Sequence, residues 1–444
     1  MKTGFCRKKI TPPLGTPIIG YYKERLTSDV IDDLYTRVAA FDDGETKAVV
    51  VAVDLCLLGK DSCDLFRKTI SEFCDVAEDA VFISCNHTHT GPLTVPDFAS
   101  DKKPDPAYME FLRVTIRDAA AYALRDMKES RFFVAETDVE GLTFVRRFKM
   151  KDGTIKKPEA GDPDIVCPVG APNETVKVLK ILRQGGDDLF IVNLGTHSDT
   201  VQGDRISADW SGYVCATLEG AMPGTNCMVL MAPQGDSIHR DLTRKDGALV
   251  TFRKNPDDVK EGAPHARYMG RVIAGKVLTV CDRAKEIGAD RIRFGKLEVE
   301  VPSHQENDRL EEAKRINDLY ESGRAAELNL QPTALTFTVA EARRILNLKN
   351  GPESFRQTLF AIRLGDFVLA GFPGEPFTAL RNMVDAKTPF ENTMVCCLVN
   401  DSPGYFPYPE AYDEGGYEVL ASVFGRETGN ILVNGMLELL NTLK

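Results

Sequence analysis

Two histidines separated by a single residue are the first candidates for chemistry in this chain. His87 and His89 follow the apolar run 81–83, and Gly91 and Pro92 come directly after them. The run predicts a buried strand and the Gly-Pro pair predicts the turn that ends it. Imidazoles at the end of a rigid strand, beside a crevice, are well placed to hold a metal or to transfer a proton. Because the chain has only six histidines, two of them here are informative.

Four more apolar strands are expected to end in reactive side chains, which are His197, the segment 236–239, Glu375 and Tyr405. In α/β sheets, ligands gather outside the strand ends, so these groups would surround one point. Imidazole nitrogen and carboxylate oxygen suit Zn²⁺, and an open position would hold a water molecule. Bound water acidified toward neutral pH is a hydrolytic nucleophile, so a metallohydrolase is the leading interpretation.

Each of these signals also has a structural explanation. About half of such His-x-His pairs would be structural on periodicity alone. Glu375 could be an acid in the first turn of a helix, and Tyr405 could be a lid over the core. Two other classes stay open, a two-metal phosphoesterase and a non-catalytic protein that binds a metal or ligand.

The elements that must position these residues alternate between strands and helices. A strand pair is predicted at 36–42 and 47–55, and helices at 61–74 and 106–125 lie on either side of the histidine strand. Further helices are predicted at 209–222, 306–323, 339–347 and 426–443. The sequence has no low-complexity linker and no repeat of solenoid period. We therefore expect one intertwined α/β unit over residues 1–444.

Composition excludes several classes of partner. The net charge of −11 argues against non-specific binding to nucleic acid or to an anionic membrane. No run approaches 18 apolar residues and the N-terminus lacks a signal-peptide pattern, so we expect a cytoplasmic protein without a transmembrane segment. The eleven cysteines include no CxxC motif and lie largely in apolar runs, which is typical of reduced, buried thiols.

The motifs together resemble those of the neutral, non-lysosomal ceramidases and their bacterial relatives, nearly end to end over that family's catalytic domain. The matching segments are ITPPLGTP (10–17), NHTHTGP (86–92), THSDTVQGDRISADWSGY (196–213), APQGD (232–236), GDFVLAGFPGEP (365–376) and NDSPGYFPYPEAYDEGGYEVLAS (400–422). The last is the most specific, because its tyrosines at 405, 412 and 417 fall at the family's spacing.

The resemblance implies mixed β-sheets with flanking helices and one zinc ion per chain. The implied zinc ligands are His87, His197, Glu375 and Tyr405. His89 resembles the catalytic histidine that contacts the substrate.

Other catalytic positions follow from the same resemblance. Tyr412 resembles the phenol that supports the oxyanion, and Arg146 is the expected substrate-binding arginine, with Arg147 as the alternative. Ser237 and His239 are further catalytic candidates.

Three departures from the family bear on the substrate. The family's Gly-Asp-x-Ser-Pro pattern is replaced by Gly235-Asp236-Ser237-Ile238-His239, so the serine is out of register. We expect the family's C-terminal β-sandwich domain to be absent, and no apolar insertion suits extraction of a lipid from a bilayer. We therefore expect hydrolysis of an amide (N-acyl) bond in a small or polar substrate by metal-activated water. A ceramidase proper is the alternative.

The segment RRFKMKDGTIKK (146–157) is locally basic in an acidic protein. Its first interpretation is a solvated hairpin. Its second is a rim that attracts an anionic amide or ester substrate. A homo-oligomer is left open by the sequence.

Overall fold

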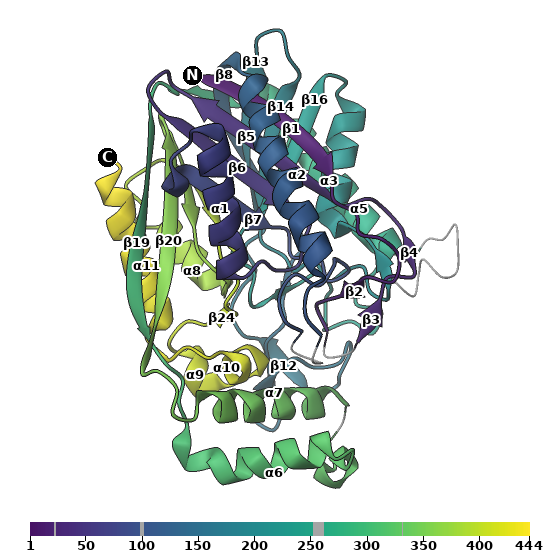
Figure 1. The fold of residues 1–444 in the computed structure, drawn as a ribbon. Helices are drawn as coiled ribbons and strands as arrows, with labels where there is room; N and C mark the ends of the chain where they lie inside the picture. Colours follow the sequence, from purple (N-terminus) through teal and green to yellow (C-terminus); the bar gives the residue numbers. More distant parts are fainter. Residues whose placement is uncertain (22–23, 98–101, 252–261, 331) are drawn as a thin grey trace.

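The larger of two main sheets organises the fold (Figure 1). The structure is a computed structural model that describes residues 1–444 except 22–23, 98–101, 252–261 and 331. Along this sheet the strand order is β16 (Thr225–Met231), β14 (Asp188–Leu194), β13 (Thr175–Arg183), β8 (Lys128–Asp138), β1 (Lys2–Lys9), β5 (Tyr35–Asp42), β6 (Lys47–Val53) and β7 (Val81–Cys85), and β18 (Lys285–Ile287) also pairs with β8. The β6–β7 and β14–β16 pairs are parallel and the others are antiparallel, so the sheet is mixed.

The two edge strands of this sheet, β7 and β16, are brought into contact by its curvature. The chain segment 397–400 fills the seam between them. The Cys397 N–H donates to the Met231 carbonyl of β16 at 2.8 Å, and the Asn400 N–H donates to the Ile83 carbonyl of β7 at 2.9 Å. A bridge between Ser84 and Val399 completes the closure, so neither edge is left as an open row of unpaired backbone groups.

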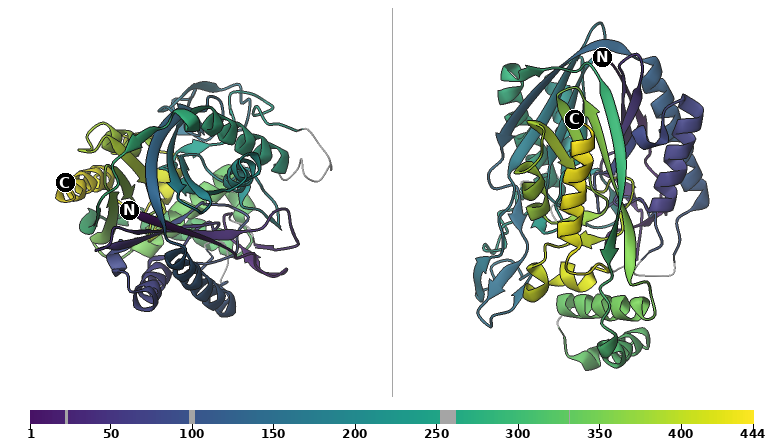
Figure 2. Two further views of the ribbon diagram at one scale, coloured as in Figure 1. Left: turned by 90° about the horizontal axis from the view of Figure 1, so that it is seen from above. Right: turned by 90° about the vertical axis from the view of Figure 1, so that its left-hand side faces the viewer.

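A second sheet packs against the first. Its order is β19 (Ile292–Pro302), β20 (Ser354–Leu364), β21 (Phe367–Gly371) and β23 (Asn392–Cys396). Alternate residues along a strand face opposite sides, and here Leu369 and Met394 join the core shared with the larger sheet, whereas Val368 and Val395 join a second core. That second core is covered by α8 (Thr378–Asp385) and α11 (Thr428–Thr442), with α11 on the outer side of β19 and β20 in Figure 2.

Helices cover the outside of the larger sheet. The predicted helix 106–125 is α2 (Pro106–Arg125), which begins where the Asp105 carboxylate accepts the Ala107 N–H at 2.9 Å. It packs over β1 and β5 and against α1 (Lys60–Cys74), which lies over β7 (Figure 1). On another part of the sheet, α3 (Asp209–Ala221) and α5 (Ala263–Val280) pack on each other and on β16 and β8.

The start of α3, the helix predicted at 209–222, does not have the ordinary cap that an aspartate at the beginning of a helix provides. Asp209 has a φ of +57°, and its carboxylate accepts the backbone N–H groups of Thr200 and Val201 at 2.9 and 2.8 Å. The acid therefore holds the loop that follows His197 instead of capping the helix in the ordinary way.

A pair of helices, α6 (Leu310–Glu321) and α7 (Pro332–Leu348), forms the lower end of the molecule in Figure 1. Both helices were predicted, but α7 begins earlier than the expected range of 339–347. Its first turns hold three threonines, at 333, 336 and 338, and Thr has weak helix propensity. The helix packs against α10 (Tyr417–Ala421).

The predicted fold class, α/β with mixed sheets and flanking helices, is confirmed. The cysteines of the apolar runs, such as Cys85 and Cys227, are buried and free. Within the described residues, no helix is long and apolar enough to cross a membrane.

Candidate metal centre

Three predicted metal ligands, His87, His197 and Glu375, come together although they are far apart in the sequence. His87 follows β7, His197 follows β14, and Glu375 follows β21 at the start of the short strand β22 (Glu375–Pro376). The φ of His87 is +65°, a left-handed conformation that is uncommon outside glycine and concentrates at functional sites. All three side chains are buried.

The spacing of the three ligand atoms matches a tetrahedral metal ion. Nε2 of His87 lies 3.3 Å from Nε2 of His197 and 3.1 Å from Oε2 of Glu375, and the His197–Glu375 separation is 3.6 Å. An ion with bonds of about 2.0–2.1 Å holds tetrahedral ligand atoms about 3.3–3.4 Å apart. The cluster therefore has the dimensions of a zinc site.

The contacts of Nδ1 in each imidazole determine which ring nitrogen can bind a metal ion. Nδ1 of His87 lies 3.0 Å from the Cys56 carbonyl, and Nδ1 of His197 lies 3.3 Å from the Gln234 carbonyl. A carbonyl only accepts, so each Nδ1 carries a hydrogen and each Nε2 is the nitrogen that faces the cluster. A positive charge is favoured at this point, and either a metal ion or a proton on Nε2 of His87 would supply it.

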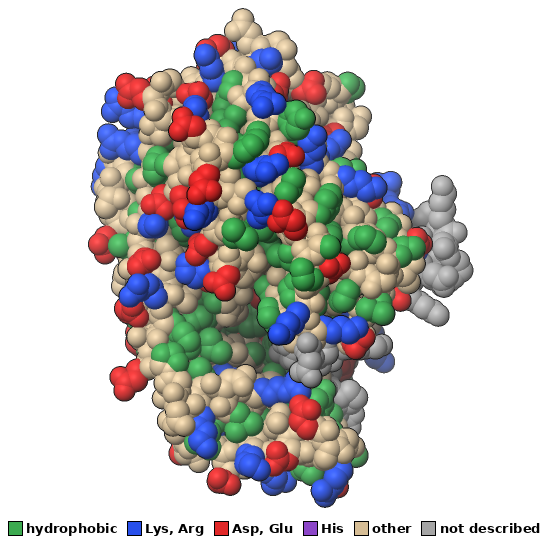
Figure 3. Space-filling view, in the orientation of Figure 1, with side chains coloured by type: hydrophobic (Ala, Val, Ile, Leu, Met, Phe, Trp, Pro, Cys, Tyr) green, Lys and Arg blue, Asp and Glu red, His purple; other side chains and the backbone are tan. Residues whose placement is uncertain are grey.

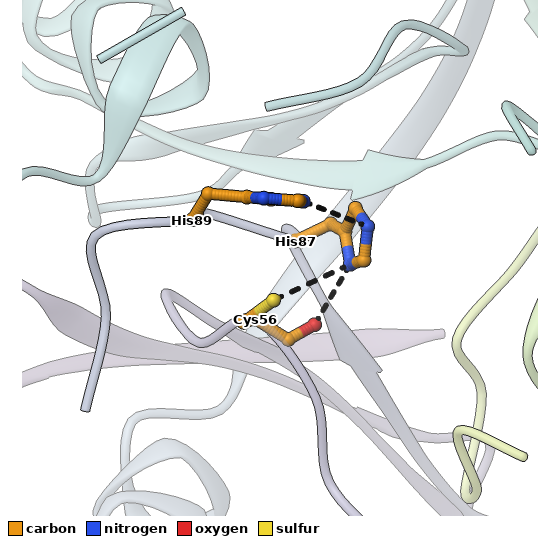
Figure 4. Close-up of side chains that lie close together, drawn as sticks. All are labelled: Cys56, His87 and His89. Atoms are coloured by element: carbon orange, nitrogen blue, oxygen red, sulfur yellow. Dashed lines mark hydrogen bonds between the residues drawn. The ribbon is translucent and has the colours of Figure 1, made fainter. Parts of the chain in front are cut away.

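The thiol of Cys56 also contacts His87, but on the other side of the ring. Its Sγ lies 3.8 Å from Nδ1, whereas His89 approaches Nε2 (Figure 4). Cys56 therefore faces away from the point at which the three ligand atoms meet, and its carbonyl orients the ring.

The electrostatic environment favours a cation at this point. Burial disfavours the charged form of His87, but the carboxylate of Glu375 outweighs it and holds the pKa of His87 well above its usual value. The same ion pair keeps the pKa of the buried Glu375 low. Burial and the positive charge of Arg146 hold the pKa of His197 well below its usual range, so its imidazole stays neutral.

His89 lies next to this cluster, with its Nε2 3.3 Å from Nε2 of His87. Its other face packs on Gly20 and lies 4.0 Å from Asp199. Burial and the positive charges of His87, Arg25 and Arg146 lower the pKa of His89 well below its usual value. His89 is therefore a neutral base at neutral pH.

Arg146 reaches the same point from the basic segment. Its Nη1 lies 3.3 Å from Nε2 of His197, and its Nη2 donates to the Gly235 carbonyl at 2.7 Å. Its Nε donates to Glu418 at 2.5 Å, so a buried carboxylate holds the guanidinium in place. The alternative, Arg147, is directed elsewhere and pairs with Glu414 at 3.0 Å.

Tyr405 is positioned beside Glu375 by backbone pairing. Strand β24 (Tyr405–Phe406) runs parallel to β22, with Tyr405 opposite Glu375 in register. The ring of Tyr405 lies 5.5 Å from the Arg146 guanidinium and lines the same cavity as the three ligands. The predicted fourth ligand is thus next to the cluster.

The three remaining predicted residues are placed away from the cavity lining. The hydroxyl of Tyr412 donates to the Phe424 carbonyl at 2.5 Å, and its ring lies against His304. Ser237 donates to the Gln234 carbonyl at 2.9 Å, and His239 packs on His265. Of the tyrosines in the tail motif, Tyr405 and Tyr417 line the cavity.

The cavity has a volume of about 690 Å³ and joins polar and apolar walls. The polar wall carries the cluster with His89, Arg146, Lys157 and Asp199, and the apolar wall includes Leu57, Val95, Phe337 and Ala421. Figure 3 shows a hollow in the lower half of this face with hydrophobic side chains beside it, above the level of α7. Such a mixed lining fits a small organic molecule.

Sequence reasoning missed several of these residues. Glu418 and Asp199 lie inside quoted motifs, but nothing in their spacing shows that they face Arg146 and His89. Lys157 ends the basic segment and was not singled out from its neighbours.

Comparisons with known proteins agree with the predicted fold. No protein-family model matches this chain, and no curated protein matches its sequence. The crystal structure of neutral ceramidase from Pseudomonas aeruginosa is similar over 99% of this chain and 74% of its own, with a TM-score of 0.71 and 17% identity. A structure of a ceramidase complexed with C2 covers 100% of this chain and 75% of its own, with a TM-score of 0.70 and 14% identity. This chain therefore has a neutral-ceramidase-like fold.

Proposed function

We propose that this protein is a zinc-dependent hydrolase that cleaves an amide bond, of the N-acyl type, in a small or polar substrate. The observation that carries the proposal is the convergence of two imidazole nitrogens and a carboxylate oxygen at tetrahedral spacing. The neutral-ceramidase-like fold supports amide hydrolysis as the reaction.

His87, His197 and Glu375 would hold the zinc ion, with Tyr405 as the fourth protein ligand. A zinc ion bound there supplies Lewis acidity and lowers the pKa of water toward neutrality. The carbonyls of Cys56 and Gln234 keep both imidazoles in the tautomer that can bind it.

His89 is the proposed general base and acid. Its neutral imidazole borders the ligand cluster and can take a proton from water and return it to the leaving nitrogen. Arg146, held by Glu418, would face the negative charge that develops on the carbonyl oxygen. Because Tyr417 lines the cavity, we assign it the supporting phenol role that the resemblance implied for Tyr412.

The cavity supports a small substrate. Its volume of about 690 Å³ falls inside the range of roughly 300–1,000 Å³ that is usual for drug-sized ligands. Among the described residues, the two groups of potential metal ligands share His87, and the second adds only Cys56, which lies on the Nδ1 side of that ring, and His89, so one metal ion per chain is the proposed stoichiometry.

The test combines metal content and activity. Purified wild-type protein should carry about one zinc ion per chain and hydrolyse members of a panel of N-acyl amines. His87→Ala and Glu375→Ala should lose both zinc and activity, whereas His304→Ala, which lies outside the cavity lining, should keep both.

The panel also includes a short-chain ceramide and a phosphodiester. Turnover of ceramide alone would favour a ceramidase proper, and turnover of the phosphodiester with two metals per chain would favour the phosphoesterase. If His87→Ala and Glu375→Ala keep full metal and full rate, the proposed centre is wrong.

A further inference from the structure

Two cationic side chains, Lys157 in the cavity lining and Arg240 near it, form no ion pair with an acid among the described residues. Lys157 lines the same cavity as His87, His197 and Glu375, and it is only partly exposed. Within the described part of the chain, neither Lys157 nor Arg240 forms an ion pair, and Nε of Arg240 is buried without a hydrogen-bond partner. Cations held this way lose hydration without regaining an equivalent contact.

The charges around Lys157 leave it without a buried acid of its own, while Arg240 acts on Asp199 of the cavity lining. Burial, with the nearby charges of Arg146 and Arg240, lowers the pKa of Lys157 to about 8. The buried carboxylate that acts on Lys157, Glu418, is already paired with Arg146 at 2.5 Å. Glu159, the other acid that acts on Lys157, is exposed. A divalent ion at the cluster would add to the positive potential.

We propose that Lys157, with the charge of Arg240 nearby, binds a carboxylate group of the substrate, so that the enzyme acts on anionic N-acyl compounds. The inference rests on the proposed amide hydrolysis and names its substrate class. An anion would supply the counter-charge that Lys157 lacks, through a charge-assisted hydrogen bond. The apolar wall of Leu57, Val95 and Phe337 would receive the uncharged part of the same molecule.

The proposal also explains the basic segment 146–157. Its exposed lysines, such as Lys151 and Lys156, belong to a solvated hairpin formed by β10 (Phe148–Met150) and β11 (Ile155–Lys156). Its two ends, Arg146 and Lys157, instead line the cavity. The hairpin thus brings two cations of different function to one site.

The experiment compares ligands that differ only in charge. N-hexanoylglycine and N-hexanoylglycinamide place the charge on the amine side, and glutaric acid mono-butylamide and its methyl ester place it on the acyl side. Binding to the full chain is measured by calorimetry and cleavage by amine release, for the wild type, Lys157→Gln and Lys157→Glu. Lys156→Gln is the matched control, because its side chain is exposed on the same hairpin.

In at least one pair, the wild type should bind the anion about tenfold to a hundredfold more tightly, as expected for a charge-assisted hydrogen bond. Lys157→Gln should remove that preference, Lys157→Glu should reverse it, and Lys156→Gln should leave it unchanged. Equal affinity for both members of both pairs, or an unchanged preference in Lys157→Gln, overturns the proposal. Anion-selective binding without cleavage of any ligand would leave this inference standing and reject the amide hydrolase.

Discussion

The buried ion pair between Arg146 and Glu418 allows the sharpest test of how the site is held. The Arg146 Nε and a carboxylate oxygen of Glu418 are 2.5 Å apart, and both side chains are buried. Glu418→Gln removes the negative charge and keeps the size of the side chain. Removing one partner of a buried pair destabilises a protein by about 3–5 kcal/mol. The amide still accepts a hydrogen bond, so we expect a loss of about 3 kcal/mol.

The same substitution should weaken metal binding. Nη1 of Arg146 lies 3.3 Å from Nε2 of His197, so a guanidinium without its counter-charge would repel a cation held by that imidazole. Substitutions that disturb the partners of metal ligands typically lower affinity by about tenfold to a hundredfold. We expect the zinc Kd of Glu418→Gln to rise by that factor.

A neighbouring pair provides the control. Arg147 is as buried as Arg146, but its partner Glu414 is 3.0 Å away and 28% exposed. Arg147 also donates to the Tyr408 hydroxyl and to the Gly415 carbonyl, so other groups share its charge. Glu414→Gln should therefore lower stability by about 1 kcal/mol or less and leave zinc affinity unchanged.

Urea denaturation of the full chain measures stability, and competition with a chelator measures zinc affinity. Glu418→Gln should lose more unfolding free energy and more zinc affinity than Glu414→Gln. Equal losses in the two variants, or wild-type zinc affinity in Glu418→Gln, would refute the view that Glu418 positions and neutralises Arg146.

Three further predictions follow from the site and its surroundings. His89→Gln should keep its zinc and lose about a hundredfold to ten-thousandfold in kcat, measured on a cleaved N-acyl amine; a kcat near that of the wild type would remove His89 from the mechanism. A Cβ at Gly20, where φ is +119°, would lie 2.9 Å from Cγ and Nδ1 of His89. Gly20→Ala should therefore lower kcat without loss of zinc. Gly15→Ala is the control, because its φ is +82° but open space surrounds it, and it should leave kcat unchanged. Burial raises the pKa of Asp32 to about 6 from a usual 3.8, so its protonated form stabilises the fold below pH 3.8 and that contribution is lost as the pH rises through 6. Asp32→Asn should flatten the pH dependence of the urea midpoint between pH 4 and 7, and an unchanged slope would contradict the assignment.

The strands and their reactive ends were the most predictable part of the protein. Apolar runs such as the one before His87 carry their own signal, because a buried strand needs continuous apolar residues. The turns that follow them are marked by Gly and Pro. The convergence of His87, His197 and Glu375 was an expectation from sheet geometry, and the structure shows it directly.

Contacts between residues distant in the chain could not be predicted in the same way. Nothing local distinguishes Arg146 from Arg147, since the choice depends on Glu418 in the tail. The phenol in the cavity is also decided by packing, because α10 carries Tyr417 toward α7 while Tyr412 turns to the Phe424 carbonyl. The spacing of the tyrosines in the tail motif therefore does not determine which of them lines the cavity.

The seam between β7 and β16 has a consequence for the order in which the protein is made. The residues that close it, 397–400, are synthesised long after the strands they join. A nascent chain must therefore carry two exposed strand edges, a state prone to intermolecular pairing, until residues 397–400 have left the ribosome. Glu375 also follows both strands in the chain, so the cluster of His87, His197 and Glu375 cannot assemble before residue 375 has emerged.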